Sequence, residues 1–108
     1  MEITQSRQGA CLLIALKGRI LIGETVAALK QVLLAALADP SNDGVVIDMA
    51  QVDYLDSTGL GELVGNLTLF KDAGKRLVLR SPAPRIMALI RLAKLDAYLP
   101  IENPPSAD

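Results

Sequence analysis

The sequence has 108 residues, enough for one domain and too few for two, and 51% of them are hydrophobic, which suffices for a core. The absence of histidine excludes a Ser-His-Asp triad and most zinc sites, and the single cysteine excludes an intrachain disulfide. A net charge of −1, with one Phe, two Tyr and no Trp, argues against nucleic-acid binding, which needs positive charge and stacking surfaces.

The beginning of the chain predicts a pair of strands. Residues 11–16 form an apolar run of the length of a buried strand, in which Cys11 is a small core side chain. Residues 3–6 are expected to pair with this strand through a turn at residues 8–9.

A helix and a central strand are predicted next. Apolar residues recur at helical spacing over residues 26–37, Thr25 is a suitable N-terminal cap, and residues 39–42 contain the breakers that end the helix. The β-branched run 45–47 then predicts a strand in the middle of a sheet.

A second helix is predicted over residues 57–73. Gly74 would end it as a C-terminal cap, and residues 77–79 form the next buried strand. At about 100° per residue, one buried arc of this helix contains Leu60, Leu63, Val64, Leu67 and Phe70.

The last part of the chain predicts a third helix and an edge strand. Pro84 fits the first position of a helix whose apolar stripe would comprise Ile86, Leu89, Ile90 and Ala93. Residues 99–101 are expected at a sheet edge, because Pro100 cannot donate a hydrogen bond in a central strand, and residues 103–108 form a loose tail. Strands that alternate with helices indicate a single α/β sheet.

The sequence also bears on location. No apolar stretch reaches the roughly eighteen residues that a membrane helix needs. The first residues lack the basic and apolar regions of a signal peptide. Together with the lone cysteine, which suits a reducing compartment, these features predict a cytoplasmic protein without direct membrane insertion.

Charge is distributed unevenly along the chain. No Lys or Arg occurs between Lys30 and Lys71, whereas seven of the eleven basic residues lie from Lys71 to Lys94. The acidic residues in the first of these intervals are Asp39, Asp43, Asp48, Asp53, Asp56 and Glu62. This pattern is either an ordinary solvated surface or an acidic face around Ser57 that attracts a basic partner and repels nucleic acid.

The segment 53–62, DYLDSTGLGE, contains the candidate site, and Ser57 has four interpretations. In the first, Asp56 or Ser57 caps the helix by accepting a hydrogen bond from a backbone N–H, worth about 1 kcal/mol. A nucleophilic serine is the second, and the absence of histidine disfavours it. The third is an aspartyl-phosphate receiver built on Asp48, but residues 17–19 are Lys, Gly and Arg where further acidic metal ligands would be needed.

The fourth interpretation is regulatory phosphorylation of Ser57. A phosphoserine at a helix N-terminus is compatible with the helix, because the dipole and the free N–H groups favour negative charge there. The added charge of about −1.5 to −2 would fall beside Asp53, Asp56 and Glu62 and would weaken any docking that the dephosphorylated surface permits.

The segment 52–61, VDYLDSTGLG, resembles the signature of the STAS domain, and within that family it is most similar to the bacterial anti-sigma factor antagonists. The resemblance covers most of the chain, with residues 1–102 as the domain. It includes residues 16–20 at the end of the second strand, residues 45–48 in the central strand and residues 73–77 before the fourth.

The resemblance implies a STAS-like mixed sheet of four to five strands with helices mainly on one face. It also implies that the unphosphorylated protein binds an anti-sigma factor serine kinase and thereby releases the sigma factor. The kinase would phosphorylate Ser57, and a phosphatase would restore binding. The protein would then be a substrate and ligand without catalytic residues, metal or cofactor of its own, and a monomer rather than an oligomer.

One position departs from the family. Many antagonists carry an aspartate three residues after the glycine at the end of the second strand, where this chain has Leu21. The departure leaves open a divergent antagonist, or a STAS module in another signalling complex or in a phospholipid-transport assembly.

Glycines in the second helix complete the candidate site. Gly61 and Gly65 fall opposite the apolar arc, so they either admit a neighbouring element of the same domain or allow a partner to approach closely. Their outward position favours a partner. The predicted partner-binding residues are Asp56, Ser57, Thr58, Gly59, Gly61, Glu62, Gly65 and Leu69.

Overall fold

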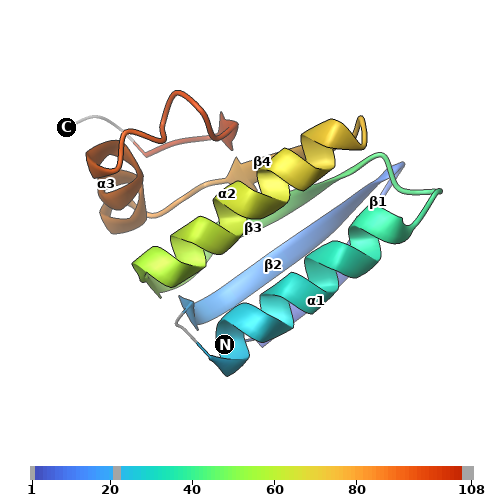
Figure 1. Cartoon of the computed structure of the whole chain (residues 1–108). Coiled ribbons are helices and arrows are strands. Elements are labelled where there is room, and N and C mark those ends of the chain that lie inside the picture. The colour runs from blue at the N-terminus through green and yellow to red at the C-terminus, as the bar shows by residue number, and fades with distance from the viewer. Residues whose placement is uncertain (1, 21–22, 106–108) are drawn as a thin grey trace.

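The computed structural model, which describes residues 2–20 and 23–105, contains one five-stranded sheet in the order β1-β2-β3-β4-β5 and three helices (Figure 1). β1 and β2 are antiparallel, and all other neighbouring strands are parallel. The elements are β1 (Glu2–Gln8), β2 (Cys11–Ile20), α1 (Glu24–Ala38), β3 (Gly44–Leu55), α2 (Ser57–Asp72), β4 (Arg76–Arg80), α3 (Pro84–Leu92) and β5 (Ile101–Glu102). Figure 1 shows α1 and α2 side by side on one face of the sheet, so the expected mixed sheet with helices mainly on one face is confirmed.

Two strands extend further than their apolar runs predict. β2 continues to Ile20 and β3 to Leu55, well beyond residues 11–16 and 45–47. The pairing of β2 with β3 shifts register twice, between Ala15 and Lys17 and again just before Arg19. Such bulges interrupt the simple alternation of apolar and polar residues, and this explains why the sequence pattern stops before the strands do.

The hydrophobic core lies between the sheet and the helices. In α2 most of the predicted arc is buried, but Val64 is only half-buried and Asn66 is buried in addition. In α3 the stripe differs from the prediction at three positions: Met87 is buried in addition, Leu89 is only half-buried, and Ala93 is exposed because the helix ends at Leu92 and Ala93 is its C-cap.

Helix ends agree with the prediction in one case and differ in another. Gly74 follows the C-cap of α2 with φ +72°, and the N–H of Lys75 donates to the carbonyl of Phe70 at 2.8 Å, as in a Schellman motif. α1 instead begins at Glu24 with Gly23 as its N-cap, so Thr25 lies inside the first turn and the predicted cap is wrong. The N-cap conformation has φ 101°, which favours glycine over threonine.

The last strand lies two residues later than expected. β5 comprises Ile101–Glu102 and pairs with the outer side of β4. The carbonyl of Pro100 still accepts a hydrogen bond from Leu79 N at 2.9 Å, and Leu99 is buried. The predicted edge position of this segment is therefore correct.

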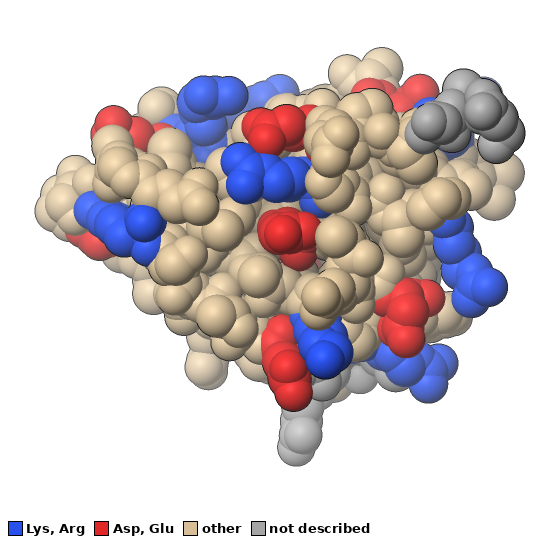
Figure 2. Space-filling view, turned by 180° about the vertical axis from the view of Figure 1, so that it is seen from behind, with Lys and Arg blue, Asp and Glu red and all other residues tan. Residues whose placement is uncertain are grey.

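The opposite face of the sheet carries charges of both signs. Figure 2 looks onto this face, where uncharged residues cover most of the surface and acidic and basic side chains alternate across the middle. Asp48, Arg80 and Glu102 are neighbours in the ladder, and Arg80 Nε donates to Glu102 Oε1 at 2.7 Å. This face therefore has no large patch of a single sign.

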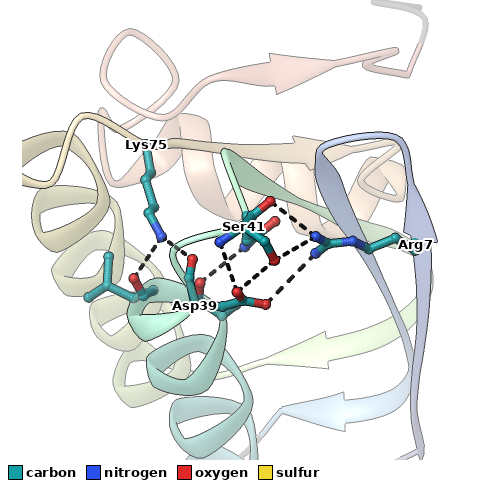
Figure 3. Close-up of polar contacts among 7 residues, drawn as sticks. Arg7, Asp39, Ser41 and Lys75 are labelled. Carbon is teal, nitrogen blue, oxygen red and sulfur yellow. Dashed lines mark hydrogen bonds and ion pairs between the residues drawn. The ribbon is translucent and has the colours of Figure 1, made fainter.

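A polar cluster joins the end of α1 to β1 and to the loop before β4 (Figure 3). The Asp39 carboxylate accepts hydrogen bonds from Ser41 Oγ at 2.7 Å and from Ser41 N at 2.9 Å. Arg7 donates to Ser41 O and Oγ, and Lys75 Nζ donates to the carbonyls of Leu37 and Asp39. The last carbonyls of α1 are thus satisfied by a side chain from a distant part of the chain.

The Asp39 cluster predicts a pH dependence of stability. The two Ser41 hydrogen bonds, helped by the positive charges of Arg7 and Lys75, hold the pKa of the Asp39 carboxyl below its ordinary value of 3.8. A carboxyl group whose pKa is lowered by folding stabilises the folded protein at pH values above its unfolded-state pKa. This stabilisation is lost as the pH falls through the pKa of the group in the folded state. Asp39→Asn should therefore lose less stability than wild type between about pH 5 and pH 2, measured as Tm.

The matched control for this prediction is Asp96→Asn, because Asp96 is exposed and its side chain makes no hydrogen bond or ion pair within the described residues. That variant should follow the wild-type pH dependence. Identical acid sensitivity of Asp39→Asn and wild type would contradict the stabilising role of the Asp39 carboxylate.

Candidate functional site

The candidate site is formed where the parallel strands β2 and β3 end together and α2 begins. Ile20 pairs with Leu55 at the last position of the ladder, and the N–H of Asp56 donates to the Ile20 carbonyl at 3.2 Å. Asp56 has an extended conformation, with φ −89° and ψ 175°, and its Oδ1 accepts a hydrogen bond from Gly59 N at 2.8 Å. Of the two residues proposed as the cap, Asp56 is the one that caps α2.

Ser57 occupies the first position of the helix and is exposed. Its hydroxyl makes no hydrogen bond to any residue that the structure describes, since the capping role belongs to Asp56. Thr58 follows and is also exposed. A negatively charged group on the Ser57 oxygen would lie at the positive end of the helix dipole, where anions are favoured.

Gly59 differs from the other predicted contact residues because it is buried. A Cβ at this position would lie 2.7 Å from Leu55 Cδ1, 2.8 Å from Ile20 Cγ2 and 3.2 Å from the Ile20 carbonyl oxygen. Glycine is therefore needed for packing within the domain, so that α2 can begin directly above the ends of β2 and β3. This corrects the placement of Gly59 on the contact surface.

The remaining contact residues of α2 form an outward stripe, which we call the α2 stripe: Thr58, Gly61, Glu62, Gly65 and Leu69. An added Cβ at Gly61 or Gly65 would meet no atom within 4 Å, so neither glycine serves the packing of this domain. Glu62 is half-buried and its carboxylate accepts a hydrogen bond from Asn66 Nδ2, whereas Leu69 is 45% exposed.

The open space over the glycines of the α2 stripe leads to a stability prediction. Gly61→Ala and Gly65→Ala should each raise the free energy of unfolding by up to about 1 kcal/mol, because alanine loses less backbone entropy in a helix. Gly65→Gln should leave Tm near or above the wild-type value and should weaken binding of a partner that approaches the stripe closely. Thermal melts measure the first effect and a binding titration the second; a loss of stability in all three variants would contradict the outward position.

A basic and an aromatic residue that sequence reasoning did not select also lie at this end of the molecule. The Arg19 guanidinium stacks over the Tyr54 ring at 5.0 Å from its centroid, and the two residues are partners in the ladder of β2 and β3. Tyr54 is 41% exposed. The parallel pairing of the two strands therefore places a basic side chain beside Tyr54, at the end of the sheet where α2 begins, so this end of the molecule is less uniformly acidic than the charge count predicts. The departure at Leu21 lies outside the described residues.

The structure disfavours the phosphate-receiver interpretation of Asp48. This residue lies within β3 rather than at its end, and its carboxylate accepts a hydrogen bond from Ala50 N at 3.0 Å. Among residues 2–20 and 23–105, no three His, Cys, Asp or Glu side chains are grouped so that they could hold a metal ion. In the same ranges, no helix has the length and hydropathy to cross a membrane.

Comparisons with known proteins agree with this arrangement. The sequence profile of the family described as "Mlab, STAS domain" matches residues 3–101. The anti-sigma-B factor antagonist of Listeria monocytogenes is 35% identical over 63 residues, which is 56% of this chain and 55% of that protein. This chain therefore aligns with little more than half the length of that relative.

Two solved structures are similar over almost the whole chain. An anti-sigma factor antagonist from Mycobacterium paratuberculosis is 31% identical with a TM-score of 0.75, over 99% of this chain and 87% of that one. An anti-sigma-factor antagonist (STAS) domain protein from Planctomyces limnophilus is 19% identical with a TM-score of 0.78, over 94% and 89% of the two chains. At 19% identity the second likeness concerns the fold alone.

Proposed function

The chain belongs to the STAS domain family, and we propose that within it this protein acts as an anti-sigma factor antagonist. In this proposal the unphosphorylated protein binds an anti-sigma factor serine kinase, and the sigma factor is released. Phosphate on Ser57 ends the binding, and a phosphatase restores it. The names of the 35% and 31% identical relatives support this choice within the family.

The observation that carries the proposal is the separation of roles between Asp56 and Ser57. Asp56 caps α2 through its bond to Gly59 N, so the helix start does not depend on the Ser57 hydroxyl. A kinase can therefore modify an exposed hydroxyl without removing a cap worth about 1 kcal/mol. The phosphoryl group adds a charge of about −1.5 to −2 at a position where the helix tolerates it and a docked partner meets it directly.

The partner contact in this proposal is made by Asp56, Ser57 and the α2 stripe. The two outward glycines leave a low surface along the helix, with the exposed Leu69 at its far end as an apolar contact. A partner backbone can approach such a surface more closely than it could approach larger side chains. Charge added at Ser57 acts at one end of this contact, next to Asp56.

The protein is a substrate and a ligand in this scheme, and the partner kinase supplies ATP and catalysis. Ser57 lacks a neighbouring general base, since the sequence contains no histidine and the adjacent Asp56 carboxylate already accepts the Gly59 N–H. No cofactor is required, and a single copy of the chain suffices. Copurification with phospholipid or membrane transport subunits, in place of a kinase, would favour the transport-assembly alternative.

Phosphorylation of Ser57 is the direct test. Incubation with the cognate kinase and ATP should place one phosphate on Ser57, located by peptide mapping, and Ser57→Ala should accept none. The protein incubated with ATP alone should remain unmodified, as expected of a non-enzyme. Phosphate on Thr58 or Ser41 with Ser57 unmodified would contradict the proposal.

A further inference from the structure

β3 extends beyond the strand that neighbours it in the sheet. β4 pairs with β3 only from Gly44 to Asp48, whereas on its other side β3 remains paired with β2 as far as Leu55. Beyond Asp48 the chain leaves β4 and forms α3, which Figure 1 shows at the same end of the molecule as the start of α2. Within the described residues, no backbone hydrogen bond joins residues 49–55 to α3 or to residues 81–83.

An unpaired strand edge recognises a particular type of ligand. Its N–H and C=O groups alternate at the spacing of a β-ladder, so they match an extended backbone and no other regular structure. Native proteins usually cover such an edge with a helix or with charged side chains. Here the covering element is α3, and it leaves space along the edge.

Two hollows follow this edge one after the other. The first, of about 510 Å³, is lined on one side by residues 50–53 of β3 and on the other by residues 83–85. The second, of about 340 Å³, is lined by Tyr54 and Leu55 on one side and by α3 on the other. Every residue from 50 to 55 therefore lines one of the two hollows, which corresponds to an extended chain of about 20 Å.

The second hollow is lined mostly by apolar side chains, whereas the first is also lined by Gln51 and Asp53. Leu92 is 81% exposed, and with Leu89 and Tyr54 it lines the second hollow. Single exposed apolar residues are common on protein surfaces, but here they gather around one concave site. Arg85 lines both hollows, is exposed, and its side chain makes no ion pair or hydrogen bond with any described residue.

We propose that this groove, formed by residues 50–55 of β3 and by α3, binds an extended segment of a partner protein as an added β-strand. The segment would carry aliphatic side chains at alternate positions, which face the apolar wall, and an acidic side chain between them that pairs with Arg85. The hydrogen bonds come from the two backbones, and the side chains determine which sequence binds. None of the residues of the α2 stripe lines the groove, so this surface is separate from the one that Ser57 controls.

A defined peptide pool tests the groove. The pool consists of acetylated and amidated seven-residue peptides with Val, Ile or Leu at alternate positions and Glu or Thr between them. In an NMR titration we expect saturable shifts of backbone amides in residues 49–55 and in α3, with slower hydrogen exchange along the edge. A second pool with alternate peptide nitrogens methylated, and the same side chains, should bind at least about tenfold more weakly because its backbone cannot donate.

Variants separate this proposal from its alternatives. Arg85→Glu should weaken binding of the Glu-containing pool about tenfold and should strengthen binding of a pool with Lys in place of Glu. Arg91 is on the same helix but outside the groove, so Arg91→Glu should leave the binding of both pools unchanged. Ser57→Asp should leave peptide binding unchanged, so failure of the switch and failure of the groove are distinguishable. The proposal is overturned if no amides shift, if the methylated pool binds equally, if the shifts fall on the α2 stripe, or if the edge is occupied by a second copy of the chain.

Discussion

Ser57→Asp is expected to weaken the complex with the anti-sigma factor kinase by at least about tenfold, which corresponds to about 1.4 kcal/mol. The substitution adds a negative charge at the exposed first position of α2, directly after the N-cap Asp56. A docked partner must cover this added carboxylate, which then loses its solvent. Repulsion between the added carboxylate and the carboxylate beside it also becomes stronger when water is excluded, so the complex is weakened. Isothermal titration calorimetry with the purified kinase measures the effect.

The fold should survive this substitution, because a carboxylate in the first turn interacts favourably with the helix dipole. Gln31→Glu is the matched control: it adds the same charge at an exposed position of α1 and should bind as wild type does. Ser57→Ala should also bind normally and then fail to respond to ATP. Wild-type affinity of Ser57→Asp, with circular dichroism showing an intact fold, would refute the electrostatic switch.

Gly59→Val is expected to cause a large loss of stability, the largest among substitutions of the three glycines of α2 by valine. The added Cβ would meet the Leu55 and Ile20 side chains at less than 3 Å and the Ile20 carbonyl oxygen at 3.2 Å, so the start of the helix must move. Overpacking of this kind typically costs 1–3 kcal/mol, and we expect about 3 kcal/mol because backbone lies behind the side chains. The corresponding fall in Tm is roughly 10–20 °C for a domain of this size.

Gly61→Val provides the matched control, because it places the same side chain two residues later where no atom lies within 4 Å. Its effect should be small, since valine is a slightly better helix former than glycine. Equal Tm values for the two variants would show that Gly59 is not held against Ile20 and Leu55. The Gly59→Val effect also has a functional consequence, because a displaced helix start would carry Ser57 with it.

The three glycines of α2 show where sequence reasoning succeeded and where it could not. Helical periodicity placed Gly61 and Gly65 on the outer face, and the open space around both confirms that position. Gly59, in the same short segment, was expected at the contact surface and is buried. Periodicity describes the direction in which a position faces within its own helix. It does not show that β2, which is distant in the sequence, ends at Ile20 and that this residue lies directly beneath Gly59.

The sequence by itself determined the order of the elements, the mixed sheet, most of the core arc of α2, the end of α2 at Gly74 and the family. These properties depend on local signals, namely apolar spacing, turn residues and one ten-residue signature, which are complete within short segments of the chain.

Only the tertiary structure decided the lengths of β2 and β3, the assignment of the α2 cap to Asp56, the place of Arg19 beside Tyr54, and the groove between β3 and α3. The physical reason is the same in each case. Strand pairing, register shifts and the space left beside a strand edge depend on segments that are distant in the sequence, and no local pattern records which of them will meet.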